Sequence, residues 1–85
     1  MKIEIYSRKG CVYCNQTKTF LADKNLPYRE YIIDQDITRD EVIERFPNQK
    51  VVPIIAIDDV VIGSWSEMLD YFFPPMKTEE DDNGQ

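Results

Sequence analysis

The only two cysteines of the chain, Cys11 and Cys14, are separated by two residues and stand where a strand pattern gives way to a helix pattern. Residues 2–6 alternate polar with apolar or β-branched side chains, as a short strand does, and residues 7–10 are typical of a turn. Residues 12–24 contain neither glycine nor proline and are expected to form a helix. A strand followed at once by a helix that begins at two thiols favours an α/β fold.

The expected helix start distinguishes the two cysteines. Unpaired backbone N–H groups and the positive end of the helix macrodipole stabilise a thiolate there, and Arg8, Lys9 and Lys18 add positive charge nearby. Cys11 receives most of this stabilisation, because Cys14 lies one turn into the helix. We therefore predict that Cys11 attacks a disulfide and that Cys14 then attacks the resulting mixed disulfide, which releases the reduced substrate.

Other uses of two cysteines fit this sequence less well. A structural disulfide at this spacing would close a very small loop and restrict the unfolded chain little. A structural zinc site needs four ligands, and the chain has no histidine and no third cysteine. Two inert buried thiols remain an alternative, whereas the absence of histidine excludes a Cys–His hydrolase. Redox chemistry is the interpretation that we favour, with no metal expected.

Composition limits the size and the surroundings of the protein. A chain of 85 residues with 42% hydrophobic content can bury one core without room for a second domain. The sequence has no apolar run near the ~18 residues that span a bilayer and no signal-peptide pattern, so we expect a cytoplasmic protein with reduced cysteines and no membrane contact. The net charge of −6 makes nucleic acid an improbable partner.

Charge also divides the chain into a domain and a tail. Residues 77–85 carry one positive and four negative charges. We expect a folded domain over residues 1–75 and a solvated, disordered acidic tail over residues 76–85.

The remaining patterns give the order βαβ, then α, then ββα. Residues 28–33 predict a second strand, which should be parallel to the first because the crossover of a βαβ unit is right-handed. Thr38 and Glu41 have the spacing of a capping box for a helix that ends near Phe46.

The last third of the sequence predicts a hairpin and a final helix. Residues 54–57 and 60–62 are apolar strands around a turn at residues 58–59, and a helix capped by Ser64 or Ser66 should follow. The side chains expected to face the core from the three helices are Val12, Phe20, Leu21, the aliphatic part of Lys24 or Ala22, Val42, Ile43, Phe46, Met68, Leu69 and Phe72.

Four short segments together resemble the glutaredoxins, small members of the thioredoxin superfamily. They are residues 5–8, 11–14, 52–53 and 62–63, and the resemblance covers residues 2 to about 73. It implies a minimal thioredoxin-like α/β fold in which a four-stranded mixed sheet is flanked by helices. It also implies a monomeric thiol–disulfide oxidoreductase that uses glutathione to reduce protein disulfides and glutathione mixed disulfides.

The resemblance assigns roles around the two thiols. Pro53 would be cis and pack beside them, and the backbone before it would pair with a substrate peptide. Arg8 would bind a carboxylate of glutathione, and Tyr13 would flank its cysteinyl part. The other residues expected at the binding groove are Val51, Val52, Gly63, Trp65, Ser66 and Glu67.

Two departures from the family pattern keep alternatives open. Val12 stands where proline is usual, and Ser66 stands in place of an acidic residue that meets the ammonium group of glutathione, a charge that Glu67 could supply. One alternative is a redoxin of the same shape that is recharged by thioredoxin reductase and serves an enzyme such as ribonucleotide reductase. Another is a module that shares an iron–sulfur cluster across a dimer, which usually has a single active-site cysteine.

Overall fold

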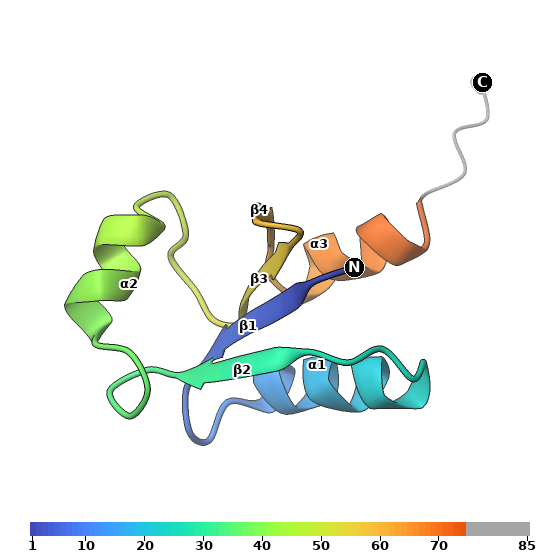
Figure 1. Ribbon diagram of the computed structural model, residues 1–85, viewed down its shortest axis with the longest axis horizontal. Helices are drawn as coiled ribbons and strands as arrows, with labels where there is room; N and C mark the ends of the chain where they lie inside the picture. The colour runs from blue at the N-terminus through green and yellow to red at the C-terminus, as the bar shows by residue number, and fades with distance from the viewer. Residues whose placement is uncertain (75–85) are drawn as a thin grey trace.

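Four strands form one mixed sheet in the computed structural model, which describes residues 1–74 (Figure 1). The strands are β1 (Ile3–Ser7), β2 (Arg29–Ile32), β3 (Ile54–Ile57) and β4 (Val60–Gly63), in the spatial order β2-β1-β3-β4. The helices are α1 (Val12–Asp23), α2 (Arg39–Arg45) and α3 (Trp65–Phe72). The predicted element order is confirmed, and the expected acidic tail lies outside the described residues.

Strand pairing follows the predicted connections. β1 is parallel to β2 and antiparallel to β3, and β3 is antiparallel to β4. Because β1 and β3 are central, their apolar side chains are buried on both faces of the sheet, and all four residues of β3 are buried. Among residues 1–74, none of the helices has the length and apolar character needed to cross a membrane.

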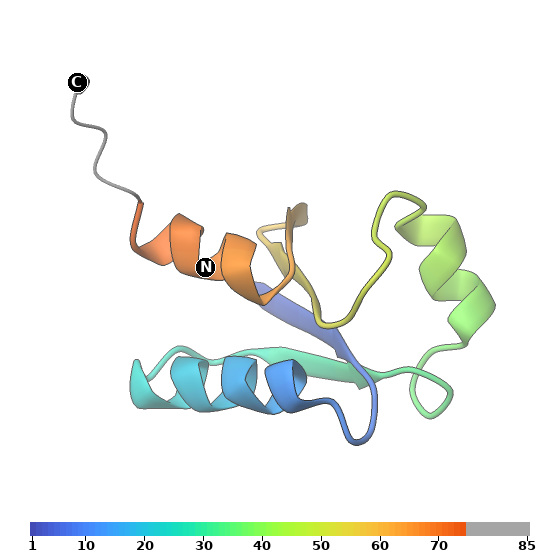
Figure 2. The ribbon, with the colours of Figure 1, turned by 180° about the vertical axis from the view of Figure 1, so that it is seen from behind.

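The two faces of the sheet carry separate cores. Helices α1 and α3 lie together on one face, and α2 stands apart near one end of the sheet (Figures 1 and 2). The first core joins α1 and α3 to the sheet through Ile3, Ile5, Leu21, Ile55, Ile57 and Met68. The second core, beneath α2, contains Tyr6, Ile37, Val42 and Ile54, with Tyr31, Ile33 and Phe46 packed against it.

The inner face of α1 differs from the prediction. Its buried residues are Cys14, Thr17 and Leu21, whereas Val12 is 65% exposed and Ala22 and Lys24 are exposed too. The steps of three and four residues between the buried positions place them on one stripe of the helix, to which Val12 does not belong. Thr17 can be buried because its hydroxyl donates to the carbonyl oxygen of Tyr13 at 2.8 Å.

Helix α2 begins at the predicted cap. The Thr38 hydroxyl accepts a hydrogen bond from the backbone N–H of Glu41 at 3.1 Å, which satisfies one free donor of the first turn. Val42 and Phe46 face the sheet as predicted, but Ile43 is 54% exposed. Ile43 follows Val42 directly, and consecutive helical residues point about 100° apart, so both cannot face the same core.

Both residues of the β3–β4 turn, Asp58 and Asp59, have positive φ values of 52° and 70°. This backbone matches the twist of a two-residue hairpin, although aspartate suits it less well than glycine. Contacts with Lys2 compensate: its backbone N–H donates to Asp58 Oδ1 at 2.7 Å, and its ammonium lies 2.8 Å from Asp59 Oδ1. The start of the chain therefore holds the turn in place.

Candidate functional site

The junction between β1 and α1 places the two cysteines. The chain turns through Gly10, which has a φ of +77°, and Cys11 is the N-cap residue of α1 with an extended backbone. The Cys11 N–H donates to the carbonyl oxygen of Arg8 at 3.3 Å, which closes the turn. Both cysteines are free thiols, and Cys14 lies in the first turn of the helix.

The two sulfurs have different surroundings. Cys11 is half-buried, and its sulfur accepts a hydrogen bond from the backbone N–H of Cys14 at 3.2 Å. Cys14 is only 1% exposed. Burial, followed by the hydrogen bond to Cys11, raises the pKa of the Cys14 thiol to about 12, while the Arg8 backbone N–H and the Lys18 ammonium oppose this rise. Cys14 is therefore a protonated thiol at neutral pH.

The Val52–Pro53 peptide bond is cis, and it lies beside Cys11. The Cys11 thiol makes a long, weak hydrogen bond of 3.9 Å to the Val52 carbonyl oxygen, and Pro53 is fully buried. The loop before β3 thus forms one wall of the space around the sulfur.

An open cleft surrounds Cys11 and contains most of the predicted site residues. Eight of them line it: Arg8, Cys11, Tyr13, Val51, Val52, Trp65, Ser66 and Glu67. Three do not line it, namely Cys14, Pro53 and Gly63, which are buried. Cys11 is consequently the sulfur that a molecule in the cleft would meet.

The cleft is also lined by residues that sequence reasoning did not identify. Arg39 at the start of α2 and Lys50 before the cis peptide bond join Arg8, so three cations and the two anions Asp34 and Glu67 line it. This balance is positive, although the whole chain has a net charge of −6. In the sequence, Arg39 and Lys50 resemble ordinary surface charges, and only the position of Lys50 next to the Val-Val-Pro segment hinted at a role.

The carboxylate of Glu67 is already hydrogen-bonded. Its Oε1 accepts from the backbone N–H of Ser64, the N-cap residue of α3, at 2.9 Å. The N–H groups of Ser64 and Glu67 itself, and then the Ser66 side chain, lower the pKa of this carboxyl group. Glu67 therefore stabilises the start of α3 and carries a negative charge at neutral pH.

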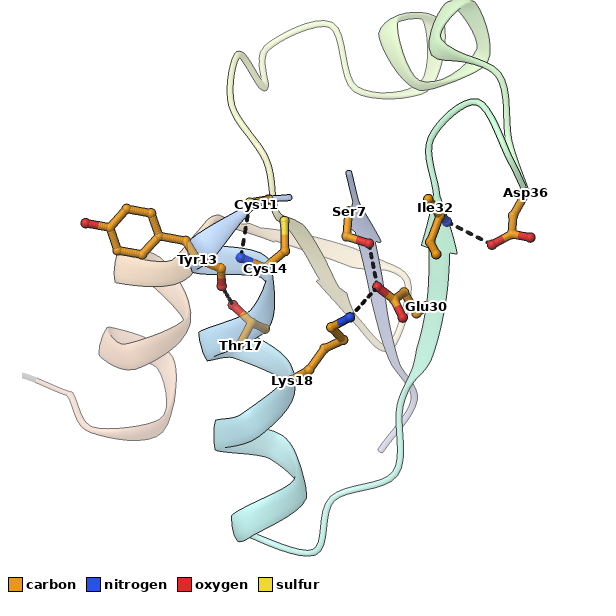
Figure 3. A network of polar contacts seen from close by, with 9 residues as sticks. All are labelled: Ser7, Cys11, Tyr13, Cys14, Thr17, Lys18, Glu30, Ile32 and Asp36. Carbon is orange, nitrogen blue, oxygen red and sulfur yellow. Dashed lines mark hydrogen bonds and ion pairs between the residues drawn. The ribbon is translucent and has the colours of Figure 1, made fainter. Parts of the chain in front are cut away.

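Behind the cysteines, a polar network joins α1 to β1 and β2 (Figure 3). The buried Ser7 hydroxyl donates to Glu30 Oε2 at 2.6 Å, and the Lys18 ammonium lies 3.0 Å from the same oxygen. Partial burial raises the pKa of Glu30, but Ser7 and Lys18 outweigh it, so the pKa lies below its usual value. The network thus holds an ionised carboxylate and an ammonium close to Cys14.

A second hollow runs between α1 and α3. It is lined by Val12, Asn15, Gln16, Thr19, Phe20, Asp23 and Trp65. Trp65 packs edge-on against Phe20, with ring centroids 6.1 Å apart. Trp65 and Val12 line both the cleft and this hollow, so they lie between the two.

Nowhere in the described part of the chain do three or more histidine, cysteine, aspartate or glutamate side chains gather closely enough to hold a metal ion. The chemistry that the arrangement offers directly is that of a half-buried thiol with a second thiol behind it.

Comparison with known proteins gives consistent matches. The glutaredoxin family model matches residues 3–62. Glutaredoxin 3 of Escherichia coli is 30% identical over 66 residues, which cover 78% of this chain and 80% of that protein.

Solved structures match the same fold. The crystal structure of glutaredoxin 1 from Francisella tularensis, complexed with cacodylate, superposes with a TM-score of 0.71 at 30% identity and covers 87% of this chain and 98% of that one. NrdH-redoxin of Escherichia coli, described as a glutaredoxin-like protein with a thioredoxin-like activity profile, superposes with a TM-score of 0.67. At 22% identity, with 91% of this chain and 100% of that chain covered, it supports the fold alone.

Proposed function

Because the chain belongs to the glutaredoxin family of thiol–disulfide oxidoreductases, we propose that it reduces protein disulfides and glutathione mixed disulfides with glutathione as its reductant. One observation carries the proposal: the half-buried Cys11 sulfur lies in a cleft lined by three cations and accepts the Cys14 N–H at 3.2 Å. An N–H donor and the start of a helix both stabilise a thiolate, which is the reactive form.

The reaction balances with two glutathione molecules. The Cys11 thiolate attacks a glutathione mixed disulfide, forms a Cys11–glutathione disulfide and expels the substrate thiolate, which takes up a proton. The thiolate of a second glutathione then attacks this disulfide, which frees Cys11 and yields oxidised glutathione. With a protein disulfide, Cys14 resolves the intermediate instead, and two glutathione molecules later reduce the Cys11–Cys14 disulfide.

The cleft suits a peptide with two carboxylates. Arg8, Arg39 and Lys50 offer cations for these groups, and Tyr13 lines the cleft from α1. The backbone of Val52, beside the Cys11 sulfur, is available for pairing with the cysteinyl part of the ligand. Because glutathione and thioredoxin systems keep thiols reduced in the cytosol, we propose the cytoplasm as the location.

A second candidate function is a redoxin that thioredoxin reductase recharges and that donates electrons to an enzyme such as ribonucleotide reductase. The engagement of Glu67 with the Ser64 N–H favours it, because this carboxylate is then less available for the ammonium group of glutathione. Ser66 is uncharged and cannot replace it. Loss of one exposed ion pair costs about 0–1 kcal/mol, so this observation weakens glutathione binding without excluding it.

A coupled assay separates the two candidates. The protein is given a small glutathione mixed disulfide with NADPH, and with either glutathione plus glutathione reductase or thioredoxin reductase alone. We expect NADPH consumption with the glutathione system and none with Cys11→Ser. Turnover with thioredoxin reductase alone would support the second candidate function instead. Turnover with neither reducing system would reject both candidate functions.

A further inference from the structure

We propose that Lys18 is a positioning residue for the resolving step, in which its ammonium, held by Glu30, stabilises the Cys14 thiolate as that thiolate attacks the Cys11 mixed disulfide. This inference rests on the proposed dithiol mechanism. It concerns the second half of that mechanism, in which the buried Cys14 sulfur reacts.

The helix places Lys18 on the correct side of α1. Lys18 follows Cys14 by four residues, so both side chains share one face of the helix. Figure 3 shows this face turned toward β1 and β2, with Ser7 and Glu30 opposite. The Lys18 and Glu30 side chains are only 30% and 22% exposed, so solvent screens the ammonium less than it would a free surface lysine.

Glu30 limits where the ammonium can lie. Its Oε2 accepts the Ser7 hydroxyl at 2.6 Å and lies 3.0 Å from Lys18 Nζ. Ser7 is 2% exposed and ends β1, which fixes the carboxylate from the sheet side. A lysine side chain, otherwise flexible, is thereby held behind the cysteines.

The resolving step needs such a group because Cys14 begins as a buried, protonated thiol. Cys14 must lose its proton to solvent, and its sulfur then forms the Cys11–Cys14 bond while the bond from Cys11 to the substrate sulfur breaks. The substrate leaves as a thiolate and takes up a proton, so no further oxidant or reductant is required. Negative charge on Cys14 exists only during this step.

Three groups act on the Cys14 thiol. Cys11 does so from the N-cap, the Lys18 ammonium from α1, and the backbone N–H of Arg8 from the loop. Glu30 of β2 contacts the ammonium of Lys18. The Lys18 ammonium favours the Cys14 thiolate, whereas burial and Cys11 oppose it. Glu30 is neutralised by Lys18 and hydrogen-bonded by Ser7, so removal of Lys18 would also leave an uncompensated carboxylate.

An aromatic disulfide that releases a coloured thiolate, dithiobis(nitrobenzoate), tests the proposal in one stopped-flow trace. Attack by Cys11 releases the first coloured thiolate, and attack by Cys14 releases the second. The variants are Lys18→Met and Lys18→Arg, with Lys24→Met as a control that removes a cation from the last turn region of the same helix. Thermal unfolding of each variant verifies that it folds.

We expect Lys18→Met to slow the second phase, relative to the first, by about three- to tenfold at neutral pH. The loss of Cys14 thiolate is partly offset, because a thiol of higher pKa is a better nucleophile once ionised. The pH profile of the second-phase rate should also shift to higher pH. Lys18→Arg should restore most of the rate, and Lys24→Met should leave the ratio of the two phases unchanged.

An unchanged ratio in Lys18→Met, or a failure of Lys18→Arg to restore it in a folded protein, would overturn the role of Lys18 while leaving the proposed function intact. Absence of the first phase in the unmodified protein would overturn both, because Cys11 would then not be the attacking thiol.

Discussion

The backbone N–H of Cys14 points at the sulfur of Cys11 from 3.2 Å, so in the proposed mechanism the second cysteine assists the first through its main chain before its own sulfur reacts. A main-chain contact does not depend on the Cys14 side chain. Substitution of that side chain should therefore separate the two halves of the reaction.

Cys14→Ser should keep the turnover of glutathione mixed disulfides and lose most of the reduction of protein disulfides. The serine variant retains the N–H donor to Cys11 but has no sulfur to resolve a mixed disulfide with a protein. Cys11→Ser should lose both activities. The measurement is turnover of each substrate in the coupled assay, and an equal loss from both variants would contradict the separate roles of the cysteines.

Arg8→Ala should raise the Michaelis constant for a glutathione mixed disulfide by up to about fivefold, with little change in the maximal rate. Arg8 is exposed at the edge of the cleft, and an exposed charge pair is worth about 0.2–1 kcal/mol. Lys2→Ala is the control, because it removes a cation that pairs with Asp59 at the hairpin turn. Equal Michaelis constants in the two variants would mean that Arg8 is a solvated surface residue that does not bind the substrate.

Gly63→Ala should destabilise the fold more than Gly10→Ala does. An added Cβ at Gly63 would lie 2.7 Å from both Cβ and Cγ of Glu67, and the φ of +133° there is one that other residues rarely adopt. Backbone strain of this kind costs about 1–3 kcal/mol before the contact is counted. Gly10 has a φ of +77° and no atom within 4 Å of an added Cβ, so Gly10→Ala reports the cost of a positive φ without a steric contact. Urea unfolding of both variants tests this, and equal losses would mean that Glu67 moves aside freely.

Thr38→Ala should lower the free energy of unfolding by about 1 kcal/mol, because the first turn of α2 loses the acceptor for the Glu41 N–H. Thr19→Ala on the exposed face of α1 is the matched control, and its effect should stay within about 0.5 kcal/mol. Chemical denaturation followed by circular dichroism measures both. A Thr38 variant as stable as the control would show that solvent replaces the cap.

The reduced protein should lose stability as the pH rises above about 9. The pKa of Cys14 is raised from 9.0 to about 12 in the folded state, so between these values the unfolded chain releases a proton that the folded chain keeps. Stability is thus fully present below the unfolded pKa and declines above it. Cys14→Ser should remove this part of the decline. The slope of unfolding free energy against pH, measured under reducing conditions, is the test, and identical slopes would contradict it.

Much of the fold was predictable because short, strong patterns coincide with its elements. The strand before Cys11, the helix after it and the Thr38 cap depend on neighbouring residues, and all were predicted. The inner face of α1 was not, because Cys14 and Thr17 are ambiguous in a hydrophobic pattern and Val12 appears apolar at an exposed position. Only tertiary packing decides which of these faces the sheet.

The residues that line the candidate site were predictable where they follow the dithiol in sequence or belong to a family motif. Arg39 and Lys50 reach the cleft only because α2 and the loop before β3 fold back beside Cys11, and no local pattern records that approach. The Ser7–Glu30–Lys18 network has the same origin, since it joins three elements whose residues look individually like ordinary surface and strand positions.

The different burial of the two sulfurs sets an order in time. A large molecule can reach the sulfur of Cys11 but not that of Cys14. Such a molecule must therefore react with Cys11 first, however reactive Cys14 is. Access therefore imposes a direction on the exchange. Bulky electrophiles should likewise modify Cys11 and leave Cys14 unmodified. The inner thiol therefore reacts only after the outer one has formed a bond.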